Sequence, residues 1–154
     1  MAQRRDMSGE TCPVARTVDV VGDRWSLLIL RDAFDGVRRF GEFQRNLGIA
    51  RNMLTDRLRM LVDAGVLAVA PASDGSAYQE YVLTAKGGEL FPMIVAMQQW
   101  GEAHLFGPGE AHSTLVERRS GRQVGAMTPR THGGRPLRHE DTAVRKIGSD
   151  DLGG

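Results

Sequence analysis

The sequence RNMLTDRLRMLVDA, at residues 51–64, repeats its apolar residues with the period of an α-helix. Leu54, Leu58 and Leu61 stand at positions i, i+4 and i+7 and, with the valine that follows, form one apolar stripe. The opposite side of the helix carries polar side chains, which are Asn52, Thr55, Asp56 and Arg59. The stretch therefore predicts an amphipathic helix that packs by its leucines and presents a polar face to solvent.

Three more helices are predicted ahead of this one, each ended by a glycine. The first begins at Pro13, a residue that fits the first turn of a helix, and the second follows Asp23, whose carboxylate can accept the free amides of a helix start. The third is short, because only Phe40, Phe43 and Leu47 recur at helical spacing before the chain turns. The terminating glycines are Gly22, Gly36 and Gly48.

A β-hairpin is predicted after the amphipathic helix, for which Gly65 is the expected C-cap. Residues 66–70 and 78–83 have the composition of strands, and an Asp-Gly pair lies at the tip of the loop between them, residues 73–77. Short helix, tight turn, amphipathic helix and hairpin follow one another in the order of a winged helix-turn-helix. The sequence therefore predicts an α+β fold of this type.

A long helix is predicted after the hairpin, capped by Thr84 and running to about Leu105. Its apolar residues cover more than one narrow stripe, so the helix has one face for its own domain and another for a partner. We therefore expect a homodimer built mainly by this helix. The predicted dimer contacts are Leu90, Ile94, Met97 and Trp100.

The chain is predicted to have three parts. Residues 1–11 form a flexible lead, residues 12–106 form the winged-helix domain with its dimerisation helix, and residues 107–154 form a tail rich in glycine and arginine. The tail is expected to be a small β appendage or partly disordered. Its candidate strands are 114–118, 124–127 and 142–147, and its candidate turns are Ser120-Gly121 and Gly133-Gly134.

The local distribution of charge points to a nucleic acid, although the net charge of the chain is only +1. Between residues 38 and 59, six arginines stand against two acids, which gives +4. An α-helix fits the major groove of B-DNA, and cations around it neutralise phosphates. We therefore predict double-stranded DNA as the partner. The predicted base-reading residues are Arg51, Asn52, Thr55 and Arg59, and the predicted phosphate contacts are Arg38, Arg39 and Arg45.

Six short motifs occur in order over about residues 10–105. They are CPVAR (12–16), GDRWSLLILR (22–31), RRFGEF (38–43), RNMLTDRL (51–58), YVLTAKG (81–87) and QWG (99–101). Together they resemble the HxlR family of bacterial transcriptional regulators. The resemblance implies a homodimer joined by its terminal helices, with paired recognition helices that read a pseudo-palindromic operator. We expect a repressor, because a protein this small has little surface left for recruiting polymerase.

The chain departs from the pattern of the resembled family at three places. Ala50 stands where a serine usually caps the recognition helix, the wing loop at residues 73–77 has no cation, and the tail lacks the cysteine pairs of some longer members. Cys12 corresponds to a cysteine through which some members sense oxidants, and the start of a helix favours its thiolate. The alternative is that Cys12 is a packed residue without a signalling role.

Other classes of function have little support in the sequence. A single cysteine excludes an internal disulfide and a cysteine-based zinc site, and the four histidines lack metal-ligand spacing, so no metal or cofactor is expected. No nucleophile–base set or phosphate-binding loop is visible, so the protein is not expected to be an enzyme. The N-terminus lacks a signal-peptide core, which favours a cytoplasmic, nucleoid-associated protein.

Two alternatives to a repressor stay open from the sequence. One is a ligand-sensing regulator of the related MarR type, for which a small-molecule or oxidant effector would have to be identified. The other is a protein–protein interaction module, because winged helices also serve in that role. The arginines between residues 38 and 59 favour DNA over a protein partner.

Overall fold

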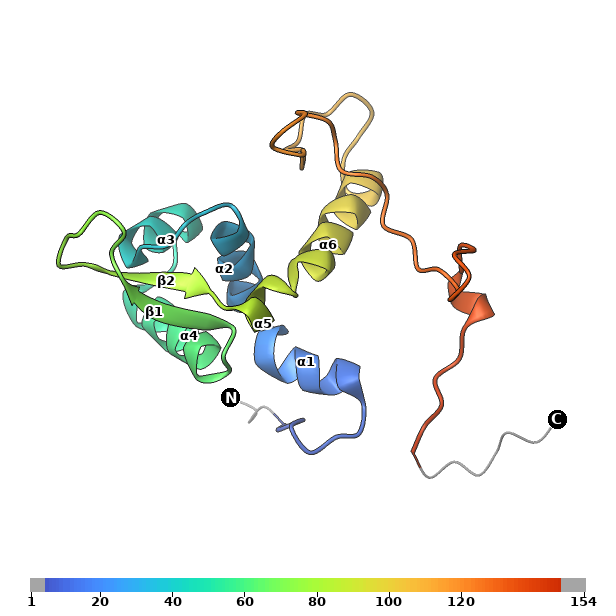
Figure 1. Ribbon diagram of the computed structural model, residues 1–154, viewed down its shortest axis with the longest axis horizontal. Coiled ribbons are helices and arrows are strands. Elements are labelled where there is room, and N and C mark those ends of the chain that lie inside the picture. Colours follow the sequence, from blue (N-terminus) through green and yellow to red (C-terminus); the bar gives the residue numbers. More distant parts are fainter. Residues whose placement is uncertain (1–4, 148–154) are drawn as a thin grey trace. The chain divides into compact units, whose positions relative to one another are not determined.

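The computed structural model describes residues 5–147, and the chain divides into two compact units, residues 1–94 and 95–154. The elements are α1 (Pro13–Val21), α2 (Arg24–Phe34), α3 (Phe40–Leu47), α4 (Arg51–Asp63), β1 (Leu67–Pro71), β2 (Gln79–Leu83), α5 (Ala85–Gly88), α6 (Phe91–His104) and the 3₁₀ helix η1 (His139–Asp141) (Figure 1). Helices joined to a two-stranded antiparallel sheet confirm the predicted α+β winged-helix class. Parts of the predicted lead (1–11) and tail (107–154) lie outside the described residues.

The leucine stripe of α4 lies at the centre of the first unit. Leu54, Leu58 and Leu61 have no exposed surface, and they share one apolar cluster with Ile29 of α2 and Phe43 of α3. Burying one leucine side chain contributes about 1.5–3 kcal/mol to folding. The predicted stripe is therefore confirmed, and its burial leaves the opposite face of α4 to solvent.

Truncation of the central leucine should destabilise the first unit without touching the exposed face. We expect Leu58→Ala to lower the free energy of unfolding by about 2–5 kcal/mol, because a cavity replaces packed methyl groups. Urea denaturation followed by circular dichroism measures this change. The adjacent Arg59 is exposed, so Arg59→Ala should shift the same quantity by less than about 0.5 kcal/mol. An equal loss in both variants would contradict the orientation of α4.

One carboxylate joins the start of α2 to α4. Asp23 Oδ2 accepts a hydrogen bond from the backbone amide of Ser26 at 3.0 Å, as predicted for the cap, and lies 3.2 Å from Nε of Arg57 in α4. Burial by itself would raise the pKa of Asp23, but the hydrogen bonds from Ser26 and the charge of Arg57 hold it below its usual value. The carboxylate that caps α2 therefore also ties α4 to it.

The end of α4 differs by one residue from the prediction. Ala64 is the C-cap, and Gly65 is the residue after it, with a left-handed φ of 74°. The amide of Gly65 donates to the carbonyl of Val62, and the amide of Val66 donates to that of Leu61, each at 2.9 Å. These two bonds form a Schellman motif, which uses glycine because its φ is positive.

The hairpin is also shifted slightly from the predicted strands. The two strands pair in antiparallel register from Leu67 opposite Leu83 to Pro71 opposite Gln79. Val66 is excluded from β1 because its amide belongs to the turn that ends α4. Tyr78 is excluded from β2 because it lies in the loop, where its carbonyl accepts the amide of Ala72 at 3.1 Å.

The prediction of one long helix after Thr84 is wrong, because the structure has two separate helices there. Thr84 is a cap as predicted, since its hydroxyl accepts the amide of Gly87 at 3.0 Å, but α5 ends after four residues and α6 begins at Phe91. Pro92 has no amide to donate to the preceding turn, and adjacent glycines weaken α5 further. Gly87 is required for packing, because a Cβ there would lie 2.0 Å from the carbonyl oxygen of Val66.

The tail lacks the three strands that were predicted for it. Residues 114–118 contribute only Val116, which forms an isolated bridge with Gln123, and residues 124–127 form neither strand nor bridge. A second bridge joins Arg130 to Pro136. Residues 142–147 form no strand, because no neighbouring segment pairs with them within the described residues. Both predicted turns are present, with Gly121 and Gly134 at positive φ.

Side chains of α6 hold the tail in the second unit. The amide nitrogen of the Gln99 side chain donates to the carbonyl of Gly125 at 2.9 Å, and its oxygen accepts the amide of Met127 at 2.8 Å. Gln98 donates to the carbonyl of Ser113 at 3.0 Å. Residues 113–127 of the tail are thus held by side-chain contacts with a helix rather than by strand pairing.

Candidate nucleic-acid interface

The solvent face of α4 brings the predicted base-reading residues together. Arg51, Asn52, Thr55 and Arg59 are all exposed, and with Asp56 they line one shallow depression. This grouping follows directly from the burial of the three leucines on the other side of the helix. A row of hydrogen-bonding groups on an exposed helix is the arrangement that a DNA major groove accepts.

Two of these side chains also serve the helix itself. Oδ1 of Asn52 accepts the amide of Met53 at 3.0 Å, at a helix start where Ala50 supplies no side-chain cap. The hydroxyl of Thr55 donates to the carbonyl of Arg51 at 2.9 Å. Asn52 keeps its two amide hydrogens as donors, and Thr55 keeps its oxygen as an acceptor. Asn52 therefore replaces part of the missing cap and still has donors for a base edge.

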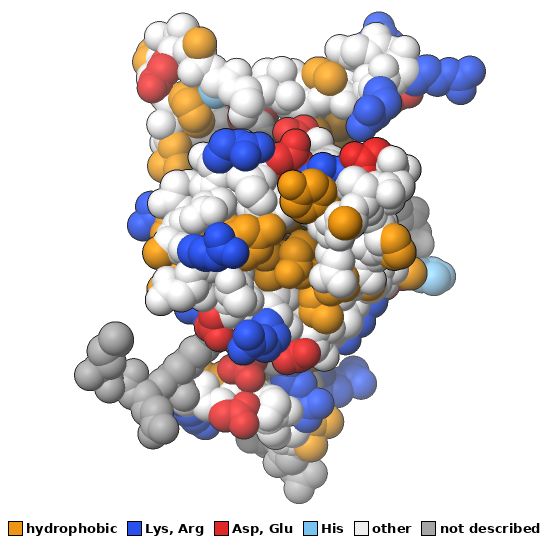
Figure 2. Space-filling view, turned by 90° about the vertical axis from the view of Figure 1, so that its left-hand side faces the viewer, with side chains coloured by type: hydrophobic (Ala, Val, Ile, Leu, Met, Phe, Trp, Pro, Cys, Tyr) orange, Lys and Arg blue, Asp and Glu red, His pale blue; other side chains and the backbone are white. Residues whose placement is uncertain are grey.

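The arginines around α4 fall into two groups. Arg57 is held by Asp23 and Asp56, and the guanidinium of Arg51 lies 5.5 Å from the centre of the Phe40 ring. Within the described residues, Arg45 and Arg59 have no acidic partner. Figure 2 shows basic side chains beside acidic ones on the face it presents, rather than a continuous basic surface. The formal charge of +4 therefore overstates the number of free cations.

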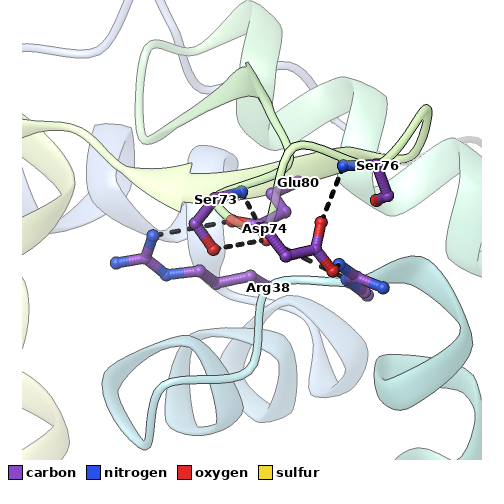
Figure 3. Close-up of polar contacts among 6 residues, drawn as sticks. Arg38, Ser73, Asp74, Ser76 and Glu80 are labelled. Carbon is purple, nitrogen blue, oxygen red and sulfur yellow. Dashed lines mark hydrogen bonds and ion pairs between the residues drawn. The ribbon is translucent and has the colours of Figure 1, made fainter.

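The two predicted phosphate contacts before α3 are paired with acids of the hairpin. Arg38 Nη1 lies 3.6 Å from Oε2 of Glu80, and Arg39 donates to Asp74 at the tip of the loop (Figure 3). Glu80 is buried in β2 and accepts hydrogen bonds from both the amide and the hydroxyl of Ser73. The polar contacts join the segment before α3 to the wing, a connection that the sequence did not reveal.

The wing therefore has a cation that its own sequence lacks. The guanidinium of Arg39 lies 5.3 Å from the centre of the Tyr78 ring, and Tyr78 is 69% exposed. With Phe40, Arg45 and Gln79, these residues line an open groove between the start of α3 and the hairpin. The sequence alone did not identify Tyr78 as a residue of the site, because only the tertiary structure places an arginine over its ring.

Hydrogen bonds lower the pKa of both acids in this cluster. The pKa of Asp74 falls to about 2, because the amide and hydroxyl of Ser76 and then the guanidinium of Arg39 favour its charged form. The pKa of Glu80 is also lowered, chiefly by the amide of Ser73, although burial acts in the opposite direction. Both groups therefore carry charge at neutral pH and keep the arginines in place.

The pKa of Asp74 tests this cluster. We expect Arg39→Gln to raise the pKa of Asp74 from about 2 toward its usual value, but not fully, because the hydrogen bonds from Ser76 remain. A carboxyl group whose pKa is lower in the folded than in the unfolded protein stabilises the fold at pH values above the unfolded-state pKa. This stabilisation is lost as the pH falls through the folded-state pKa. Carboxyl-carbon NMR during acid titration measures the change. Arg45→Gln is the matched control, and an equal shift there would contradict the pairing.

The predicted dimer residues separate into two environments. Leu90 and Ile94 are half-buried and pack against the apolar core of the first unit. Met97 and Trp100 belong to the second unit and are exposed, Trp100 at 60%. The side chains with surface left for a partner are therefore those in the second half of α6.

Cys12 lies at the start of α1, where it is exposed and makes no side-chain cap. Arg16, one turn along α1, donates from Nε to the carbonyl of Glu10. The alternative of a packed cysteine is not observed within this chain, because Cys12 is exposed. Its role as a redox sensor stays a prediction.

Residues 5–147 contain neither a metal-binding cluster nor a membrane-spanning helix. No group of three or more histidine, cysteine, aspartate or glutamate side chains is placed to hold a metal ion. No helix in this part of the chain is long and apolar enough to cross a bilayer.

The sequence of the winged helix matches a known family. Residues 20–107, more than half of the chain, match the family described as HxlR-like helix-turn-helix. The chain belongs to the HxlR family. Five of the six motifs found in the sequence, from residue 22 to residue 101, and the whole of α4 lie within the matched residues.

Relatives and solved structures agree with this membership. An uncharacterized HTH-type transcriptional regulator of Mycobacterium tuberculosis is 52% identical over 92 residues, which are 60% of this chain and 58% of the relative. The match thus spans little more than half the length of that relative. The crystal structure of PA1607, provisionally assigned as a transcription factor, is 54% identical, covers 90% of this chain and 97% of its own, and has a TM-score of 0.85. The redox regulator HypR in its oxidized form is 36% identical over 60% of this chain and 97% of its own, with a TM-score of 0.55.

Proposed function

We propose that this protein is a DNA-binding transcriptional regulator that acts as a homodimeric repressor and reads a pseudo-palindromic operator with α4. Membership of the HxlR family supports the general role. The observation that carries the proposal is the exposed row of Arg51, Asn52, Thr55 and Arg59 on a helix whose other face is buried. A protein with this role acts on chromosomal DNA in the cytoplasm, at the nucleoid.

In the proposed complex α4 lies in the major groove and its exposed side chains meet base edges. Arg59 has no acidic partner in the described chain, so its guanidinium is available for two parallel hydrogen bonds to a guanine. The side-chain amide of Asn52 offers donors at the start of the helix. Thr55 lies one turn along and presents an oxygen that can accept.

Phosphate contacts come from arginines outside α4. Arg45 is exposed and without an acidic partner in the described chain, so it can bind phosphate directly. In the ion pair of Arg39 with Asp74, Asp74 is exposed and Arg39 partly exposed, so solvent screens the attraction and the pair contributes little to stability. A DNA phosphate can therefore take the place of Asp74 at little cost, with Tyr78 supporting the arginine from the wing.

The base-reading role of Arg59 has a direct test. Arg59→Ala should weaken binding of the operator by about 1–3 kcal/mol and bind unrelated DNA almost as before, because a base contact is lost. Arg45→Ala is the matched comparison and should weaken both DNAs alike, with a shallower dependence on salt. Fluorescence anisotropy with the operator and a scrambled duplex distinguishes the two variants. Unchanged operator binding in a triple alanine variant of Asn52, Thr55 and Arg59 would refute the assignment of this face.

The proposed dimer places two recognition helices on one operator. Exposed Met97 and Trp100 give α6 an apolar surface that a partner would cover. Half-sites should then lie about 10 bp apart or a multiple of that spacing. A dimer with two-fold symmetry presents the same helix to each half-site, which is why the proposed operator is a pseudo-palindrome.

Sedimentation tests this dimer. We expect a dimer at micromolar concentration, and we expect Trp100→Glu to give monomers with weaker operator binding, because the substitution puts a charge in an apolar contact. Trp25→Leu in the first unit is a control for general loss of an aromatic side chain. A wild-type monomer that binds DNA as one chain per site would contradict the proposal.

A further inference from the structure

A pocket of about 250 Å³ lies in the first unit beside α1. Its walls come from α1, from the turn that follows α4, from α5 and from the segment joining α5 to α6. The apolar lining residues are Val20, Val21, Val66 and Leu90. Arg16 and Lys86 also line the pocket, so an apolar floor carries two cations and no acid among its lining residues.

Both cations are held by neutral backbone groups. Lys86 Nζ donates to the carbonyl of Ala64 at 2.7 Å, and Arg16 Nε donates to the carbonyl of Glu10. An ammonium has three donors and a guanidinium five, so one carbonyl does not exhaust either group. Each cation can therefore give a further hydrogen bond to an anion in the pocket, and such bonds are stronger with a charged acceptor.

We propose that this pocket binds a small organic carboxylate with a compact apolar body. The body would lie against Val20, Val66 and Leu90, and the carboxylate would meet Lys86 and Arg16. The volume is slightly below the range of about 300–1,000 Å³ that is usual for ligand sites, so the acid is of single-ring size. A neutral compound of the same shape would leave the two cations without a counter-charge.

The site is connected to the end of α4 through Lys86. The carbonyl that Lys86 bonds is that of the C-cap of α4, and Thr84, two residues away, bonds the carbonyls of Gly65 and Val66 in the same turn. A carboxylate is a stronger acceptor than a backbone carbonyl, so it draws the ammonium toward the pocket, weakens the bond from Lys86 to Ala64 and loosens this end of the helix. Where the proposed function holds, the acid and the operator therefore bind antagonistically, by a factor of about five or more.

Binding is tested first without DNA, so that it does not depend on the proposed function. Benzoate is titrated into the full chain and followed by amide NMR, with benzamide as the neutral probe. We expect benzoate to shift the amides of Val20, Val66 and Lys86, and benzamide to bind about tenfold more weakly, as loss of a charged hydrogen bond requires. Equal binding of both probes, shifts confined to another region, or no binding because a second copy covers the pocket would each overturn the proposal.

Two variants locate the site. Lys86→Met keeps the alkyl stem and removes the charge, whereas Val20→Phe fills the pocket from its exposed rim and leaves the bond between Lys86 and Ala64 in place. Both should lower the affinity for benzoate about tenfold or more, and Lys146→Met, the chain's other lysine, should not. Val20→Phe is decisive if Lys86→Met fails to fold, and wild-type affinity in that variant overturns the proposal.

A separate measurement addresses the coupling to DNA. Operator affinity is measured with and without saturating benzoate in the wild type and in Val20→Phe. We expect benzoate to weaken the wild type and to leave Val20→Phe unchanged. Absence of benzoate binding to the wild type refutes the pocket, whereas failure of the unliganded wild type to bind any operator refutes the proposed function alone.

Discussion

Leu54, Leu58 and Leu61 are fully buried on one side of α4, and the position of every proposed DNA contact on this helix depends on that burial. A helix has one rotation about its axis that hides all three leucines, because they lie along a single stripe. The same rotation turns Asn52 and Arg59 to solvent. Packing energy thus orients a surface that takes no part in the packing.

Polar contacts then hold α4 in place at its start, its middle and its end. Arg57 pairs with the carboxylate that caps α2, Asn52 supplies a helix-start bond that Ala50 cannot, and Lys86 donates to the carbonyl of the last cap. Two of these contacts come from α2 and α5, so a change in either element reaches α4. The proposed pocket beside Lys86 is thereby connected to the proposed DNA-binding face.

The ion pairs of the hairpin determine which of the nearby arginines is available to bind another anion. In the sequence Arg38 and Arg39 have no evident partner, yet in the structure they form ion pairs with Glu80 and Asp74 of the hairpin. The buried Glu80 needs such partners, since an ionised carboxylate is costly to bury alone. Exposed Asp74 is a weaker partner, and so Arg39 is the arginine that is more easily released to another anion.

The sequence by itself determined the features that depend on near neighbours. Helical spacing identified α1 to α4, the Asp-Gly tip identified the hairpin, and Asp23 and Thr84 were recognised as caps, because periodicity and caps involve residues within a few positions. The break before Pro92 was a local signal that was overlooked. The motifs also sufficed to indicate the HxlR family.

The tertiary structure alone decided the features that need distant partners. Candidate strands in the tail did not form because a strand needs a neighbour to bond, and in the segment 124–127 the side chain of Gln99 bonds the backbone of Gly125 and Met127 instead. Arg39 meets Asp74 across 35 positions, and Lys86 meets Ala64 across 22. Such pairs form only after packing brings the segments together, so no local pattern in the chain encodes which arginines stay free for DNA.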